Sequence, residues 1–148
     1  MIAKKGKTTD EAQIRGLIED WVKALRARDI EGVMANYAAN VVVFDIDPPL
    51  YYEGADRLRL KWEGMFKSFR GPIDYKVQDV EVIAGDETAF SHSLNHISAT
   101  GNDGKKTQTW LRATICYQMI EGNWRVTHEH VSVPFDPDTG KASLELEP

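Results

Sequence analysis

The spacing of apolar positions changes once along the chain, from helical spacing to alternation. In residues 8–28 apolar side chains recur three or four positions apart, which predicts a long amphipathic helix. These positions are Ile14, Leu17, Ile18, Trp21, Val22 and Leu25. Thr8 and Glu11 have the spacing of a capping box, so we expect the helix to begin there.

Two further helices and a short strand are predicted before the alternation begins. Asp29 is a favourable N-cap for a short helix that reaches Tyr37. Residues 41–45, VVVFD, are rich in β-branched and aromatic side chains, which predicts a strand ending at Asp45. Helical spacing then returns over residues 55–69.

Apolar and polar positions alternate over the second half of the chain. The alternation predicts four consecutive antiparallel strands, at residues 73–83, 88–99, 106–120 and 124–135. Helices followed by long strands indicate an α+β domain, in which a cone-shaped, curved antiparallel sheet wraps around the long N-terminal helix. The open end of such a cone is a natural pocket.

Length and composition restrict the class of protein. The chain has 148 residues, of which 42% are hydrophobic and 28% charged, as in a single soluble domain. We expect this domain over residues 8–135, a flexible N-terminus over 1–7 and a C-terminal extension over 136–148. No apolar run approaches the roughly 20 residues of a membrane helix. No signal peptide is recognisable, so a cytoplasmic location and no membrane partner are expected. A net charge of −5 with scattered cations disfavours nucleic acid as a partner.

The strand at residues 124–134 carries the most distinctive polar pattern. Alternation places one set of side chains on a single face: Trp124, Val126, His128, His130 and Ser132. This face runs from apolar to polar, as expected for a strand that starts in the core and ends at a cavity, because unpaired polar groups are costly to bury. A half-solvated strand with its histidines at the rim explains the pattern equally well.

Two charged residues can reach the same pocket. Asp45 ends the first predicted strand, and Arg112 lies on the strand before the histidine pair. With His128 and His130 they would supply a general base, a fixed cation and two groups that exchange protons near neutral pH. The structural alternative is an Asp45–Arg112 ion pair that closes the open end of the cone without catalysis.

Metal and thiol chemistry are not favoured. His128 and His130 share a face, and His92 or His96 could add a third ligand, but the further spaced ligands of a strand metal site do not follow. We therefore expect no metal. The single cysteine, Cys116, is expected to pack as a small hydrophobe.

The order of these elements and three sequence runs carry a family resemblance. The runs are VVVFD at 41–45, GAD at 54–56 and WRVTHEHVSVP at 124–134. Over about residues 8–135 the chain resembles the SnoaL-like and ketosteroid-isomerase-like branch of the nuclear transport factor 2 superfamily. That superfamily includes isomerases, cyclases, hydrolases, dehydratases and non-catalytic binding modules, so the resemblance implies the fold more strongly than an activity.

The resemblance also implies roles for particular residues. Set against the steroid isomerases, the general base falls on Asp45, and the oxyanion-hole tyrosine falls on Trp21, whose indole N–H is a donor in a different direction. The second oxyanion donor has no counterpart in residues 88–99, which argues against steroid isomerisation itself. Epoxide hydrolases of this fold use an Asp-Arg-Asp arrangement, and Asp45 and Arg112 match two of its members.

The leading hypothesis is a cofactor-independent enzyme of the isomerase, cyclase or hydratase type acting on an apolar carbonyl-containing substrate. Asp45 would be the base, and His128, His130 and Arg112 would polarise the developing oxyanion. The other expected ligand contacts are Trp21, Tyr37, Trp110, His92 and Ser132. The alternative hypothesis is a non-catalytic module that binds a small ligand or serves in assembly.

The resemblance further implies a homodimer. We expect it to form through the outer face of the sheet, where Ile115, Tyr117 and Met119 would otherwise be exposed.

Overall fold

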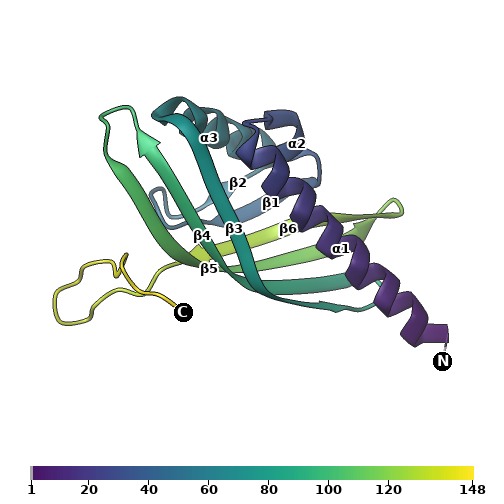
Figure 1. Cartoon of the computed structure of the whole chain (residues 1–148). Helices are drawn as coiled ribbons and strands as arrows, with labels where there is room; N and C mark the ends of the chain where they lie inside the picture. The colour runs from purple at the N-terminus through teal and green to yellow at the C-terminus, as the bar shows by residue number, and fades with distance from the viewer. Residues whose placement is uncertain (1) are drawn as a thin grey trace.

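The computed structural model describes residues 2–148, with side chains from Thr9 onward. Within this range three helices pack on one six-stranded sheet whose strand order is β2-β1-β6-β5-β4-β3 (Figure 1). The sheet is curved, and α1 runs diagonally across its concave side. The predicted α+β class, with a curved sheet wrapped around a long N-terminal helix, is confirmed.

The helices are α1 (Ile2–Arg26), α2 (Ile30–Met34) and α3 (Ala55–Ser68). The backbone of α1 begins six residues before the predicted start, so Thr8 lies within the helix. The Thr8 side chain lies outside the described part of the structure. Asp29 caps α2 as predicted, because its side chain accepts a hydrogen bond of 3.1 Å from the backbone N–H of Gly32.

The six strands have the following bounds: β1 Tyr37–Phe44, β2 Tyr52–Glu53, β3 Phe69–Ala84, β4 Thr88–Gly101, β5 Lys106–Ile120 and β6 Asn123–Ser132. The four long antiparallel strands expected from the alternation are therefore present. Tyr37, which we expected in the second helix, instead begins β1. β1 pairs with β6 in parallel, so the first strand of the chain lies beside the last one.

A bulge in β6 decides which side chains reach the concave side of the sheet. Tyr117 pairs with Val126, but the adjacent Cys116 pairs with His128, so Thr127 is an extra residue in β6. Because successive side chains of a strand point to opposite faces, one extra residue exchanges the two faces. Val126 therefore points inward before the bulge and Glu129 points inward after it.

The core lies between α1 and the concave face of the sheet. Ile14 and Leu25 of α1 are fully buried there, as the helical pattern predicts. None of the helices in the described range is long and apolar enough to cross a membrane.

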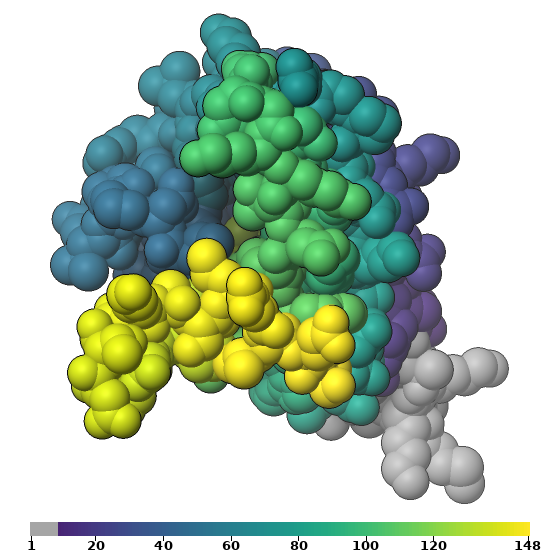
Figure 2. Space-filling model, turned by 60° about the vertical axis from the view of Figure 1, so that its left-hand side comes forward, coloured from purple at the N-terminus to yellow at the C-terminus, as the bar shows by residue number. Residues whose placement is uncertain are grey.

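The C-terminal segment leaves β6 and turns back against β5. A β-bridge joins Phe135 to Ala142, and the Thr109 hydroxyl donates a hydrogen bond of 2.8 Å to the backbone carbonyl of Leu144. Figure 2 shows this segment in yellow against the green of β5, beside a hollow in the surface. The C-terminal residues therefore pack on β5 and border this hollow.

Candidate functional site

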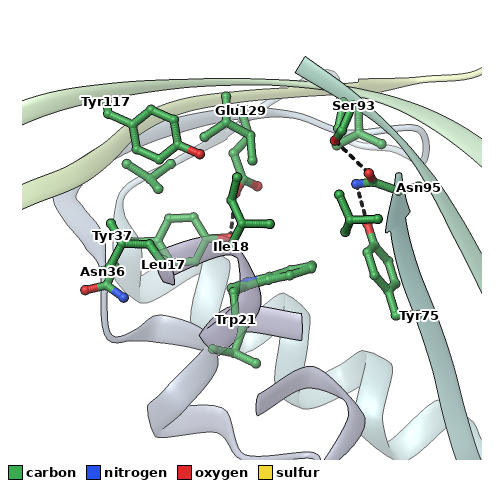
Figure 3. A pocket seen from close by; sticks show the side chains of 16 residues that line it. Leu17, Ile18, Trp21, Asn36, Tyr37, Tyr75, Ser93, Asn95, Tyr117 and Glu129 are labelled. Atoms are coloured by element: carbon green, nitrogen blue, oxygen red, sulfur yellow. Dashed lines mark hydrogen bonds between the residues drawn. The ribbon is translucent and has the colours of Figure 1, made fainter. Parts of the chain in front are cut away.

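A cavity lies between α1 and the concave face of the sheet (Figure 3). Its volume is about 60 Å³, whereas one buried water needs about 10–15 Å³, so it has room for several waters or a compact ligand. Most of its lining is apolar. The polar side chains that line it are Asn36, Tyr37, Tyr75, Ser93, Asn95, Tyr117, Glu129 and the indole of Trp21.

Glu129 is the carboxylate of this cavity. Its residue is 9% exposed, and its Oε1 accepts a hydrogen bond of 2.7 Å from the hydroxyl of Tyr37. Burial raises the pKa of Glu129, while the Tyr37 hydrogen bond and the charge of Lys61 oppose that rise. Burial and the neighbouring Glu129 raise the pKa of Tyr37 well above its ordinary value, so Tyr37 is a neutral donor. The site therefore combines an acid–base group with a fixed hydrogen-bond donor.

A second polar group faces this pair from the other side of the cavity (Figure 3). The side-chain N–H of Asn95 donates to the Tyr75 hydroxyl at 2.9 Å, and the Ser93 hydroxyl donates to Asn95 Oδ1 at 2.7 Å. Burial raises the pKa of Tyr75, so its hydroxyl stays neutral. This chain holds the Asn95 amide in a fixed orientation at the cavity wall.

Trp21 places a hydrogen-bond donor without an acceptor at the cavity. Its Nε1 is buried and has no hydrogen-bond partner in the described structure, a property it shares with Trp62 Nε1. The indole lies near enough to the Tyr37 hydroxyl to oppose the rise in the pKa of that group, but the geometry of a hydrogen bond is incomplete. Because a buried donor without a partner is costly, a ligand oxygen would satisfy this N–H.

Asp45 forms an ion pair with Lys61 of α3, and not with Arg112. The two side chains are 12% and 14% exposed. Lys61 Nζ also lies 5.5 Å from the ring centre of Tyr52 and 5.0 Å from that of Trp62. Burial lowers the pKa of Lys61 to about 8, and the charge of Glu129 opposes that shift. The contact with Asp45 likewise favours the charged form of Lys61.

The remaining predicted catalytic residues lie outside the cavity. The bulge at Thr127 turns His128 and His130 to the convex face of the sheet, where Phe44 packs edge-on against both rings. His128 Nδ1 is 2.7 Å from the carbonyl oxygen of Val42. Arg112 is exposed on the same convex face. The predicted grouping of Asp45, Arg112 and the two histidines in one pocket is therefore wrong.

The predicted ligand contacts divide between the two faces of the sheet. Trp21 and Tyr37 line the cavity as expected. Three others lie on the convex face: Trp110 packs against His96, Ser132 accepts a hydrogen bond of 3.2 Å from Arg112 Nε, and His92 is exposed.

The prediction of which β5 residues lie on the outer face of the sheet is also wrong. Ile115 and Tyr117, which we expected on the outer face, line the cavity instead. Met119 packs against the core on the same side.

Sequence reasoning did not select Glu129 and Asn95, two of the polar residues that line the cavity. Glu129 and Val131 are two positions apart and therefore point to the same face of β6, where both line the cavity. A single carboxylate on a face with valines is the one sequence signal that could have indicated that Glu129 is buried. Asn95 lies with Ser91 and Ser93 on one face of β4, but the sequence does not say that this face is concave. Among the described residues no cluster of three or more His, Cys, Asp or Glu side chains could hold a metal ion.

Comparison with known proteins agrees with this architecture. Residues 14–136 match the family model of the SnoaL-like domain, so the chain belongs to the SnoaL-like family. The comparison with curated proteins gives no match.

Solved structures show the same fold. An NTF2-like protein of unknown function from Pseudomonas putida shares 37% identity, with a TM-score of 0.87 over 95% of this chain and 98% of that one. A nuclear transport factor 2 superfamily protein from Salmonella enterica serovar Typhimurium gives 0.78 at 17% identity, over 92% and 99% of the two chains. A ketosteroid isomerase-like protein from Erwinia carotovora atroseptica gives 0.71 at 21% identity, over 83% and 95%.

Proposed function

We propose that the chain is an acid–base enzyme that moves a proton on a small apolar carbonyl compound. The observation that carries this proposal is the buried Glu129 carboxylate, held by the Tyr37 hydroxyl in a largely apolar cavity that also contains the unpartnered Trp21 N–H. Glu129 takes the role that the sequence assigned to Asp45, because Asp45 is engaged by Lys61. A ketosteroid isomerase-like name among the solved structures is compatible with this class of reaction.

The proposed step needs no group beyond those of the cavity. Glu129 in its ionised form accepts a proton from the carbon next to the carbonyl, and the electron pair of that C–H bond forms the enolate. The Trp21 N–H donates to the oxygen on which negative charge develops. In a β,γ-unsaturated ketone the electron pair extends over the double bond, so protonated Glu129 can return the proton to the γ-carbon, which isomerises the substrate to the conjugated ketone. A carboxyl with a raised pKa is suited to both transfers, since its basicity is closer to that needed near neutral pH.

Exchange of substrate hydrogen with solvent tests this proposal without knowledge of the natural substrate. The protein is incubated in D₂O with a set of small flat ketones, and loss of the proton next to the carbonyl is followed by NMR. We expect wild type to accelerate exchange for one class of ketone and Glu129→Gln to abolish it. Glu81→Gln, which changes an exposed carboxylate of β3, is the matched control. Full exchange activity in Glu129→Gln would overturn the assignment.

A non-catalytic binding module is the second candidate function. It is favoured by the observation that Glu129 and Asn95 are already hydrogen-bonded within the protein. It predicts that the ketones raise the melting temperature, as a ligand that binds only the folded state must, while none of them exchanges hydrogen.

We also propose that the chain forms a homodimer through the convex face of the sheet. Three apolar side chains are exposed in this region, with Phe44 at 41%, Phe90 at 41% and Ile83 at 55%. Phe90 is paired with Ile83 on one side and with Cys116 on the other, so the patch is continuous across neighbouring strands. Sedimentation at micromolar concentration should give a dimer that Phe90→Glu dissociates. A monomeric wild-type chain would exclude it.

A further inference from the structure

A second hollow lies on the surface of the protein, next to the cavity that contains Glu129. It is a groove of about 840 Å³ lined by residues of α1 and β3. β3 is the strand at the edge of the sheet (Figure 1). Two arginines of α1 are fixed along this edge: Arg15 donates to the carbonyl of Val80 at 3.1 Å, and Arg26 donates to the carbonyl of Tyr75 at 2.6 Å. They hold α1 on β3 at two points, with the groove alongside.

The charge of the groove is opposite to that of the whole chain. Four cations line it, Arg15, Lys23, Arg26 and Lys76, and Glu19 is the one carboxylate among its lining residues. Arg26 also forms an ion pair of 3.6 Å with Asp74, so the excess positive charge comes from the other three cations. The net formal charge of the chain is −5. The side chains of Lys23 and Lys76 are exposed. They make no ion pair within the described structure. A concave surface lined by one sign of charge attracts ligands of the opposite sign.

The groove and the cavity share part of their walls. Ile18, Tyr75 and Val77 line both hollows, so these side chains form part of a common wall. The floor of the groove beside them is apolar, with Val22 and Val80. A molecule that has a charged end and an apolar end therefore meets cations on the outside and an apolar space directly behind them.

We propose that the groove holds the carboxylate of an anionic amphiphile whose apolar chain lies along Val22 and Val80 and whose end passes Ile18 and Val77 into the cavity. This inference rests on the proposed function in that the same cavity receives the ligand, and it names the substrate class as an apolar carbonyl compound with an anionic group. The anion lies between Lys23 and Lys76, and the reacting carbon lies deeper, near Glu129.

Direct binding of simple amphiphiles tests the proposal without turnover. Decanoate, decanol and decylammonium are titrated into the full-length chain at low salt. Two exposed ion pairs should make decanoate bind roughly tenfold more tightly than decanol, a difference of about 1.4 kcal/mol. Decylammonium should bind most weakly, and added salt should remove the preference. The double variant Lys23→Gln/Lys76→Gln should bind decanoate no better than decanol.

Two sets of variants separate the groove from the cavity. Lys67→Gln/Lys106→Gln removes two lysines that do not line the groove and should keep the preference for decanoate. Ala113→Leu fills the cavity and should weaken decanoate and decanol alike, and Val131→Phe serves if that variant fails to fold. Equal affinity for decanoate and decanol, or undiminished binding to a folded cavity-filled variant, would overturn the proposal. If no ketone exchanges hydrogen but decanoate binds as described, the proposed reaction fails and the ligand class stands.

Discussion

The hydroxyl of Tyr37 donates a hydrogen bond of 2.7 Å to Oε1 of Glu129, and so joins the first residue of β1 to the end of β6 at the cavity. Both side chains are buried. A buried carboxylate is costly unless it is hydrogen-bonded, so this contact reduces the cost of placing Glu129 there.

Removal of the Tyr37 hydroxyl should therefore act through Glu129. In Tyr37→Phe the carboxylate loses its hydrogen-bond donor, which should lower the free energy of unfolding by about 1–3 kcal/mol and raise the pKa of Glu129 further. Urea unfolding at neutral pH measures the first effect. Tyr51→Phe is the control, because Tyr51 is 47% exposed. Equal stability of the two variants would contradict the role given to this hydrogen bond.

Neutralisation of Glu129 should change the pH dependence of stability. Because burial raises its pKa above 4.5, the folded chain binds more protons than the unfolded chain between 4.5 and the folded value. The free energy of unfolding should then fall as pH rises through this window. Glu129→Gln should remove this fall, and at pH 7 it should be at least as stable as wild type. Melting temperatures from about pH 4 to about pH 8 measure both effects, because this range begins near the ordinary pKa of a glutamate and extends above it.

The control for this prediction is an exposed carboxylate. Glu81→Gln should leave the pH dependence of the wild type unchanged. A Glu129→Gln variant that is less stable than wild type at pH 7, with an unchanged pH dependence, would mean that the carboxylate stabilises the fold.

The Asp45–Lys61 ion pair should behave as a buried structural pair. Asp45→Asn leaves the Lys61 ammonium without its partner and should cost roughly 3 kcal/mol, the lower part of the range for breaking a buried pair. The double variant Asp45→Asn/Lys61→Met should recover part of this loss, because no unpaired charge remains. A double-mutant cycle by chemical unfolding measures the coupling. Additive losses would show that the two side chains do not stabilise each other.

The fold was predictable because its signals are local and repeated. The helical stripe of α1 and the alternation in β3 to β6 each extend over many residues, so one misread position does not change the element. The cap at Asp29 is similarly local. The start of β1 was misplaced because Tyr37 is compatible with either a helix end or a strand, and its pairing with Val126 lies 89 positions away in the sequence.

The site was less predictable because it depends on two features without a sequence signal. Thr127 is an ordinary strand residue, and nothing in its type marks it as the bulge that exchanges His128 and Glu129 between faces. Lys61 looks like a solvated position of α3, and its burial follows from the packing of that helix on Asp45. Trp21 was selected because the resemblance places it at the oxyanion-hole tyrosine of the steroid isomerases, and both Trp21 and Tyr37 line the cavity.

The indole N–H of Trp21 is buried and has no hydrogen-bond partner in the described structure. Trp21→Phe removes a donor that has no acceptor in the described structure, so the loss of stability should come only from the smaller ring. Trp62→Phe is a matched control, because its N–H is also unpartnered but its side chain is not part of the cavity lining. With cyclohexanone as the probe, Trp21→Phe should lose about tenfold in affinity, the value of one hydrogen bond, and Trp62→Phe should lose little.

Methylcyclohexane separates this hydrogen bond from the shape of the cavity. It has the ring of cyclohexanone without the oxygen, so Trp21→Phe should bind it about as well as wild type does. Calorimetric titration of both compounds against the two variants provides the comparison. If Trp21→Phe weakens both compounds equally, the indole acts through packing alone. A loss confined to cyclohexanone would identify Trp21 Nε1 as the donor to the ligand oxygen, which is the position that the proposed reaction requires.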